Sequence, residues 1–156
     1  MKHRTLYIGI DPGKSGGISA INDRGEIHSA DPMPATCHEL ADLLRDIQQS
    51  AESVQAVLER VHSSPQMGVT SAFTFGQGYG RIEAALAALG IPHDVVTPQK
   101  WQGELGCMSG GDKNVTKARA MQMFPDCKVT HKIADSLLLA EFCRRGREEK
   151  IKVKKD

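Results

Sequence analysis

Residues 7–21 read Tyr7-Ile8-Gly9-Ile10-Asp11-Pro12-Gly13-Lys14-Ser15-Gly16-Gly17-Ile18-Ser19-Ala20-Ile21 and place one carboxylate between two strand-like runs. The run from Leu6 to Ile10 is short, apolar and rich in β-branched and aromatic residues, which is typical of a strand buried on both faces. Pro12-Gly13 breaks the pattern and strand character resumes at Gly16, so we predict a hairpin with Asp11 at the end of its first strand. Such a side chain could bind a hard cation, or it could only cap its own Asp-Pro-Gly turn.

Length and composition limit the classes to which the chain can belong. Its 156 residues, 40% of them hydrophobic, predict a single domain over residues 1–156 with a basic tail from about residue 144. No apolar run is long enough to cross a bilayer and the four cysteines lack paired spacing, so we expect a cytoplasmic protein with reduced thiols and no membrane association. The net charge of +1 gives no overall signature of nucleic-acid binding. The cationic tail is either a solvated, frayed end or a contact for a phosphate backbone.

The next part of the chain continues the sheet and adds a helix. Residues 25–30 are predicted to form a third antiparallel strand after a turn at residues 22–24. Thr36 and Glu39 form a capping box before a helix with apolar residues at helical spacing. The run from Val54 to Glu59 is predicted to be a buried strand parallel to the first, because a helix separates the two.

The second half of the chain alternates helices with one more strand. We predict a helix over about residues 71–89, with small residues along one face, and a fifth strand over residues 93–97. A short helix begins at Pro98 and another is opened by Lys113. The last helix is predicted to run from about Ile133 to Cys143.

Four potential metal ligands stand at the ends of these elements. Asp11 and Glu59 fall at the same ends of strands that are predicted to be neighbours. Asp135 falls in the first turn of the last helix, and His131 shares its face if that helix begins early enough. A first-turn Asp also favours the helix dipole, and His131 could be an exposed loop residue. Together the four side chains suit two divalent cations such as Mg²⁺, which could support phosphodiester hydrolysis.

Five segments in this order resemble the RuvC-type Holliday junction resolvases, especially their short phage-encoded branch. They are Ile8–Gly13, Leu58–Glu59, Phe75–Gly78, Val96–Trp101 and Ala134–Ala140. The resemblance covers nearly the whole chain. It implies an α/β, ribonuclease H-like fold: a five-stranded mixed sheet, its first three strands antiparallel, with helices on both faces. It also implies a Mg²⁺-dependent endonuclease that acts as a homodimer on four-way DNA junctions in recombination and repair, in the bacterial host cell if the protein is phage-encoded.

The resemblance also implies a site. Its catalytic and metal-binding residues would be Asp11, Glu59, Asp135 and His131, holding two Mg²⁺ ions, with Mn²⁺ as an expected substitute. Bacterial members usually have the fourth ligand three positions before the final Asp, where this chain has Lys132, so His131 is the expected ligand here.

The remaining expectations concern how the protein holds DNA. An aromatic side chain that stacks on a base in the bacterial enzymes corresponds to His62, with Phe73 or Phe75 as alternatives. Cations are expected to gather around the carboxylates and contact phosphates: Lys14, Arg60, Lys100, Lys113, Lys117 and Arg119. The helix over residues 71–89 is expected to form part of the dimer interface.

Two other functions remain open. A nuclease of this fold could act on other branched DNA or on an RNA–DNA hybrid, because such sites share their chemistry. The chain could also be a non-catalytic module that binds junctions. Several acids at one sheet edge count against the second alternative, because packing alone does not favour uncompensated carboxylates.

Overall fold

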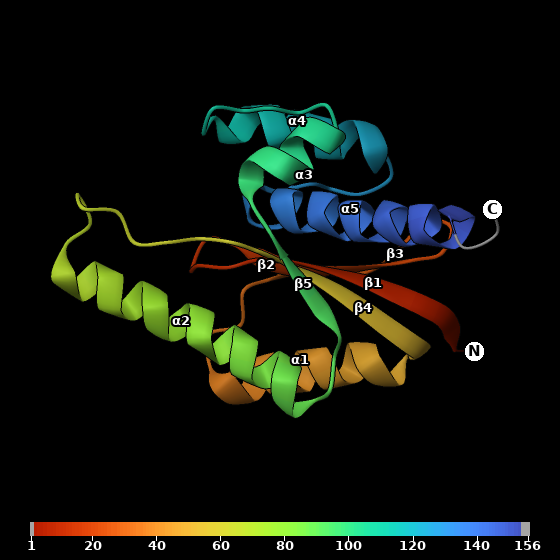
Figure 1. Cartoon of the computed structure of the whole chain (residues 1–156), viewed down its shortest axis with the longest axis horizontal. Helices are drawn as coiled ribbons and strands as arrows, with labels where there is room; N and C mark the ends of the chain where they lie inside the picture. Colours follow the sequence, from red (N-terminus) through yellow and green to blue (C-terminus); the bar gives the residue numbers. More distant parts are fainter. Residues whose placement is uncertain (1, 154–156) are drawn as a thin grey trace.

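A single five-stranded sheet organises the computed structural model, which describes residues 2–153, with side chains up to residue 150 (Figure 1). The strands are β1 (His3–Asp11), β2 (Gly17–Asn22), β3 (Ile27–Pro32), β4 (Ala51–Glu59) and β5 (His93–Val96). Their order across the sheet is β3-β2-β1-β4-β5. The first three strands pair antiparallel, whereas β4 pairs parallel to β1 and β5 parallel to β4. The predicted mixed sheet is therefore confirmed.

Helices cover both faces of the sheet, as predicted (Figure 1). One face carries α1 (Cys37–Gln49) and α2 (Val69–Ala88), and the other carries α3 (Pro98–Glu104), α4 (Lys113–Met123) and α5 (His131–Val153). Each face has its own apolar core, one beneath α1 and α2 and one beneath the last three helices. None of the helices within residues 2–153 is both long and apolar enough to cross a membrane.

The local signals for α1 are confirmed. Thr36 Oγ1 accepts a hydrogen bond from the Glu39 amide at 3.2 Å, and Glu39 Oε2 accepts one from the Thr36 amide at 3.1 Å. This capping box satisfies amides that the first helical turn leaves without partners. The residues spaced for a core, Leu40, Leu44 and Ile47, are buried against the sheet.

The helix α5 lies directly on the middle of the sheet. A side chain at Gly9 of β1 would overlap the backbone of Ser136 and Ala140, so only glycine allows this approach. Ser19 Oγ of β2 and Ser136 Oγ are 2.7 Å apart in a buried hydrogen bond. These two contacts fix the start of α5 above the strand that ends at Asp11.

The bounds of α5 differ from the prediction at both ends. It begins at His131, so Asp135 lies in its second turn and the predicted first-turn position is wrong. It also continues as helix past residue 144, where a frayed tail was an alternative. Lys154 and Lys155 of that tail lie outside the described residues.

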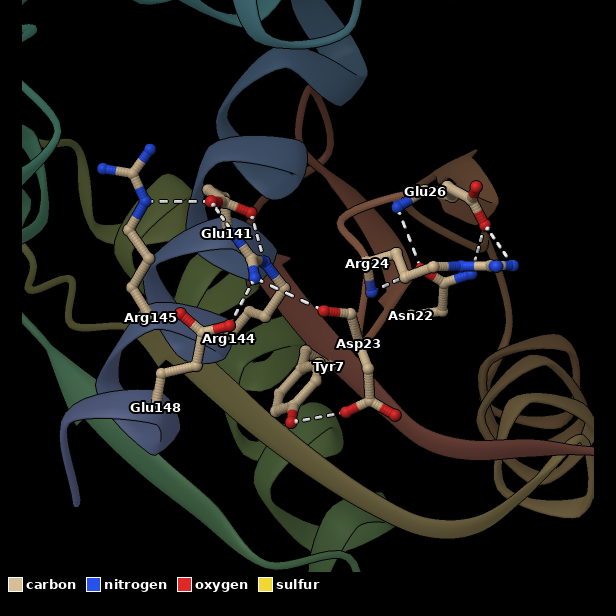
Figure 2. Close-up of polar contacts among 9 residues, drawn as sticks. All are labelled: Tyr7, Asn22, Asp23, Arg24, Glu26, Glu141, Arg144, Arg145 and Glu148. Atoms are coloured by element: carbon tan, nitrogen blue, oxygen red, sulfur yellow. Dashed lines mark hydrogen bonds and ion pairs between the residues drawn. The ribbon is translucent and has the colours of Figure 1, made fainter. Parts of the chain in front are cut away.

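Polar contacts hold this helical extension in place (Figure 2). Arg144 donates to Glu141, to Glu148 at 2.7 Å and to the carbonyl of Asp23 at 3.4 Å. Tyr7 of β1 donates to the carboxylate of Asp23 at 3.0 Å. Glu141 is almost fully buried, yet its hydrogen bonds with two arginines outweigh burial and lower its pKa. The helix therefore extends because its charges are paired along it and with the β2–β3 turn.

Candidate active site

Three carboxylates from three different elements meet at one edge of the sheet. Asp11 ends β1 and Glu59 ends β4, and these neighbouring parallel strands are in register through the pair Ile10 and Leu58. Asp135 enters from α5. The three residues are only 6%, 7% and 2% exposed, respectively. The charges of Glu59 and Asp135 both raise the pKa of Asp11, so the three groups are close enough to interact.

Asp11 is the carboxylate that the fold perturbs most. A side chain at Gly16 would overlap the Asp11 carbonyl and lie 3.1 Å from its carboxylate carbon, so the hairpin closes tightly around it. Burial, followed by the charges of Glu59 and Asp135, raises the pKa of Asp11 to about 7, against the opposing effect of Lys113. Asp11 therefore holds a proton for part of the time near neutral pH, which a divalent cation would replace.

Glu59 is oriented by the only tryptophan of the chain. Trp101, fully buried in α3, donates from Nε1 to Glu59 Oε2 at 2.7 Å. Burial raises the pKa of Glu59, although this hydrogen bond opposes the change. Trp101 is thus a donor to the site as well as a core residue, and no spacing rule links residues 59 and 101.

Asp135 is paired with a lysine. Lys113, the first residue of α4, forms an ion pair with Asp135 Oδ2, although its own side chain is 59% exposed. Burial opposes the charge on Lys113, but the hydrogen bond that Lys113 donates to Asp135 and the charges of all three carboxylates raise its pKa overall. The other oxygen, Asp135 Oδ1, is buried without any hydrogen-bond partner. The ammonium group of Lys113 thus lies among the carboxylates.

The donor set fits a hard divalent cation. As the site stands, no group of three or more His, Cys, Asp or Glu side chains within the described part of the chain is arranged to hold a metal ion. The carboxylates are nevertheless of the type that Mg²⁺ prefers, and Asp135 Oδ1 is a buried acceptor that lacks a donor. With all groups ionised, three carboxylates and one ammonium group leave a net negative charge at the site, which favours the binding of cations.

A cavity of about 310 Å³ opens beside these groups, and Glu59, Lys113 and Asp135 line it. The loop between α3 and α4 also lines it, through Met108, Ser109, Gly110 and Gly111. The buried Gln102 anchors that loop, because its Oε1 accepts from the amide of Ser109 at 3.1 Å and from its hydroxyl at 3.0 Å. A substrate group could therefore reach the carboxylates from this side.

The other predicted ligand and the stacking candidates are more peripheral. His131 is exposed at the start of α5, and within residues 2–153 no hydrogen bond or ion pair joins it to the three carboxylates. His62 is exposed between β4 and α2. Phe73 is 72% exposed on α2, whereas Phe75 is half-buried, with its Cε2 3.9 Å from where a Gly13 side chain would begin.

The predicted cations lie on several elements around the site. Lys14 is exposed on the turn after Asp11, and Arg60 is exposed directly after Glu59. Lys100 is exposed on α3 and Lys117 is half-buried on α4. Arg119 donates instead to the carbonyl of Leu105 at 2.9 Å, so part of its guanidinium supports the neighbouring loop.

A second and larger cavity is lined by residues of α2, of the turn after Asp11 and of the segment before α1. It measures about 640 Å³, and its lining includes Lys14, Arg81 and Phe75. Its lining thus includes both the turn that follows Asp11 and α2, the helix that carries Phe73 and Phe75.

Comparisons with known proteins support the fold. No family model matches the sequence, and no curated protein matches it. Among solved structures, the Thermus thermophilus RuvC structure aligns with a TM-score of 0.66 at 15% identity, covering 92% of this chain and 96% of the other. The structure of T. thermophilus RuvC in complex with Holliday junction substrate aligns with a TM-score of 0.64 at 14% identity, covering 86% and 90%. The chain therefore has the ribonuclease H-like fold of RuvC.

Proposed function

We propose that this protein is a structure-specific DNA endonuclease that resolves four-way junctions by metal-dependent phosphodiester hydrolysis. One observation carries the proposal: buried Asp11, Glu59 and Asp135 converge from β1, β4 and α5 at one edge of a ribonuclease H-like sheet. Packing does not account for three acids there, because burying carboxylates without compensation is unfavourable. The alignment with RuvC in complex with a Holliday junction substrate favours branched DNA as the substrate class.

The three carboxylates would hold the metal, with His131 as the proposed fourth ligand because it lies one helical turn before Asp135. Two Mg²⁺ ions, or Mn²⁺ in their place, would supply the positive charge that activates water and stabilises the leaving oxygen. The chain's own contribution is to fix the acids in place. Trp101 orients Glu59, and the contact of Ser136 with Ser19 sets the height of Asp135 above the sheet.

The cations near the site would position DNA without reading its sequence. Lys14 and Arg60 directly follow two of the carboxylates, and Lys100 and Lys117 extend the positive surface over α3 and α4. Phe73 is the proposed stacking residue because its ring is free of the core, with His62 and Phe75 as alternatives.

A homodimer is part of the proposal, because cutting two opposed strands symmetrically requires two sites related by a two-fold axis. The helix α2 is the proposed interface. Its glycines Gly76 and Gly80 have open space around them, so another helix could approach closely. Light scattering should give twice the monomer mass at working concentration.

The test is a cleavage panel. The wild-type protein would be incubated with Mg²⁺ and a four-way junction, a flapped duplex, a linear duplex or an RNA–DNA hybrid of matched sequence. The proposal predicts paired nicks in the junction and little cleavage of the linear duplex. If the protein cleaved the hybrid or the flapped duplex faster than the junction, that nucleic acid would be its substrate instead. Junction binding without cleavage of any substrate would instead identify a non-catalytic module.

A further inference from the structure

Lys113 occupies an unusual position for a surface lysine. It is the first residue of α4, and more than half of its side chain is exposed to solvent. Its ammonium group nevertheless forms an ion pair with the buried Oδ2 of Asp135. A largely exposed side chain thus carries a charge that pairs with a buried carboxylate.

The ion pair between Lys113 and Asp135 is one that another cation could replace. Lysine is a compact point charge on a flexible four-carbon stem, and this stem can move away without disturbing a buried side chain. The partner carboxylate is only half satisfied, because Asp135 Oδ1 has no donor. A divalent cation on this carboxylate would repel an ammonium group bound to it, so the two cations would compete.

We propose that Lys113 is a built-in counter-ion of the acidic site, which neutralises Asp135 in the metal-free protein and is displaced when a divalent cation binds. This inference rests on the proposed metal-dependent function. The released ammonium remains tethered beside the cavity that Glu59 and Asp135 also line. Metal binding would therefore place a positive group where a substrate phosphate enters.

The first test measures Mn²⁺ affinity by calorimetry on metal-free protein. Lys113→Met removes the competing charge and should tighten Mn²⁺ binding by about tenfold or more, as expected for loss of one charge-assisted hydrogen bond. It should also lower the metal-free unfolding midpoint by about 3 °C and increase the stabilisation that Mn²⁺ gives. Lys113→Arg keeps the charge and should stay near wild type. Lys128→Met, which removes an exposed lysine outside the site, is the matched control.

A second test uses the unmodified protein and does not depend on a variant that folds. Amine acylation followed by mass spectrometry would report the reactivity of each lysine with and without Mn²⁺. Labelling of Lys113 should rise severalfold when Mn²⁺ is added, while labelling of Lys128 stays constant.

The outcomes separate this inference from the proposed function. The counter-ion role would be overturned if wild-type and Lys113→Met protein bound Mn²⁺ with equal affinity and Lys113 labelling did not change. The metal site itself would then stand. Failure of every form to bind Mn²⁺ or Mg²⁺ at millimolar concentration would overturn both. Tighter binding in Lys113→Met alone, with metal-dependent labelling of Lys113, supports the displacement.

Discussion

Replacing Trp101 with Phe tests how the protein keeps an ionised carboxylate at a buried strand end. The substitution keeps an aromatic ring in the core but removes the Nε1 donor that lies 2.7 Å from Glu59 Oε2. Loss of a hydrogen bond to a charged group costs about 1.5–3 kcal/mol, and the smaller ring adds roughly 1 kcal/mol for the space it leaves. The free energy of unfolding should therefore fall by about 2.5–4 kcal/mol where Glu59 is ionised.

The pH dependence separates the two contributions. Burial raises the pKa of Glu59 in the folded protein. The free energy of unfolding therefore falls as the pH rises from the ordinary pKa of this group through its raised pKa. Removing the indole donor enlarges that loss, whereas the loss from the smaller ring does not depend on pH. The destabilisation should therefore be about 2.5–4 kcal/mol at a pH above the raised pKa of Glu59, and nearer 1–2 kcal/mol at a pH below its ordinary value of 4.5.

The assay is urea unfolding followed by far-ultraviolet circular dichroism, since the variant lacks the only tryptophan. Glu59→Gln is the matched background. In it the side chain is already neutral, so Trp101→Phe should cost less and show little pH dependence. An equal loss at both pH values in the wild-type background would refute the idea that the indole supports the charge on Glu59.

Three further predictions address the same edge of the sheet. Asp11, whose pKa is raised to about 7 from an ordinary 3.8, should make the metal-free protein less stable as pH rises between these values, by on the order of 4 kcal/mol. Asp11→Asn should flatten this dependence in denaturant unfolding measured across pH. Gly9→Ala should lower the free energy of unfolding by about 3 kcal/mol or more, because its methyl group would overlap the backbone of α5. Gly146 of α5 has open space around it, so Gly146→Ala should raise the free energy of unfolding by up to about 1 kcal/mol. Lys14→Ala and Arg60→Ala should each weaken junction binding and reduce the salt dependence of the logarithm of affinity by about one, as measured by fluorescence anisotropy, and unchanged slopes would remove these residues from the DNA-contacting surface.

The architecture was predictable because each element has a local signal. Alternating strand and turn residues around Asp11, the capping box at Thr36 and the apolar run that ends at Glu59 each specify one element. The parallel placement of β4 beside β1 then follows from the intervening helix. Asp11 and Glu59 could be placed at one sheet edge for the same reason.

The details that the sequence could not reveal are long-range. The hydrogen bond from Trp101 to Glu59 and the ion pair of Lys113 with Asp135 join residues far apart in the chain, and neither periodicity nor spacing encodes such contacts. The charges on Lys113 and Arg119 could be recognised, but not their partners. The end of α5 was misjudged because a run of cations resembles a solvated tail until Arg144 is seen to pair with Glu141 and Glu148.

The central claim is that the three buried carboxylates form a metal-dependent nuclease centre for four-way junctions. Comparing wild-type and Asp11→Asn protein on one labelled junction tests it most directly. Cleavage in Mg²⁺ and binding in its absence would be measured in parallel. The account predicts that the wild type nicks two opposed strands only when Mg²⁺ is present, and that Asp11→Asn binds the junction with similar affinity but does not cut it. Equal cleavage by both proteins, or wild-type cleavage that is unaffected by removing the metal, would contradict it.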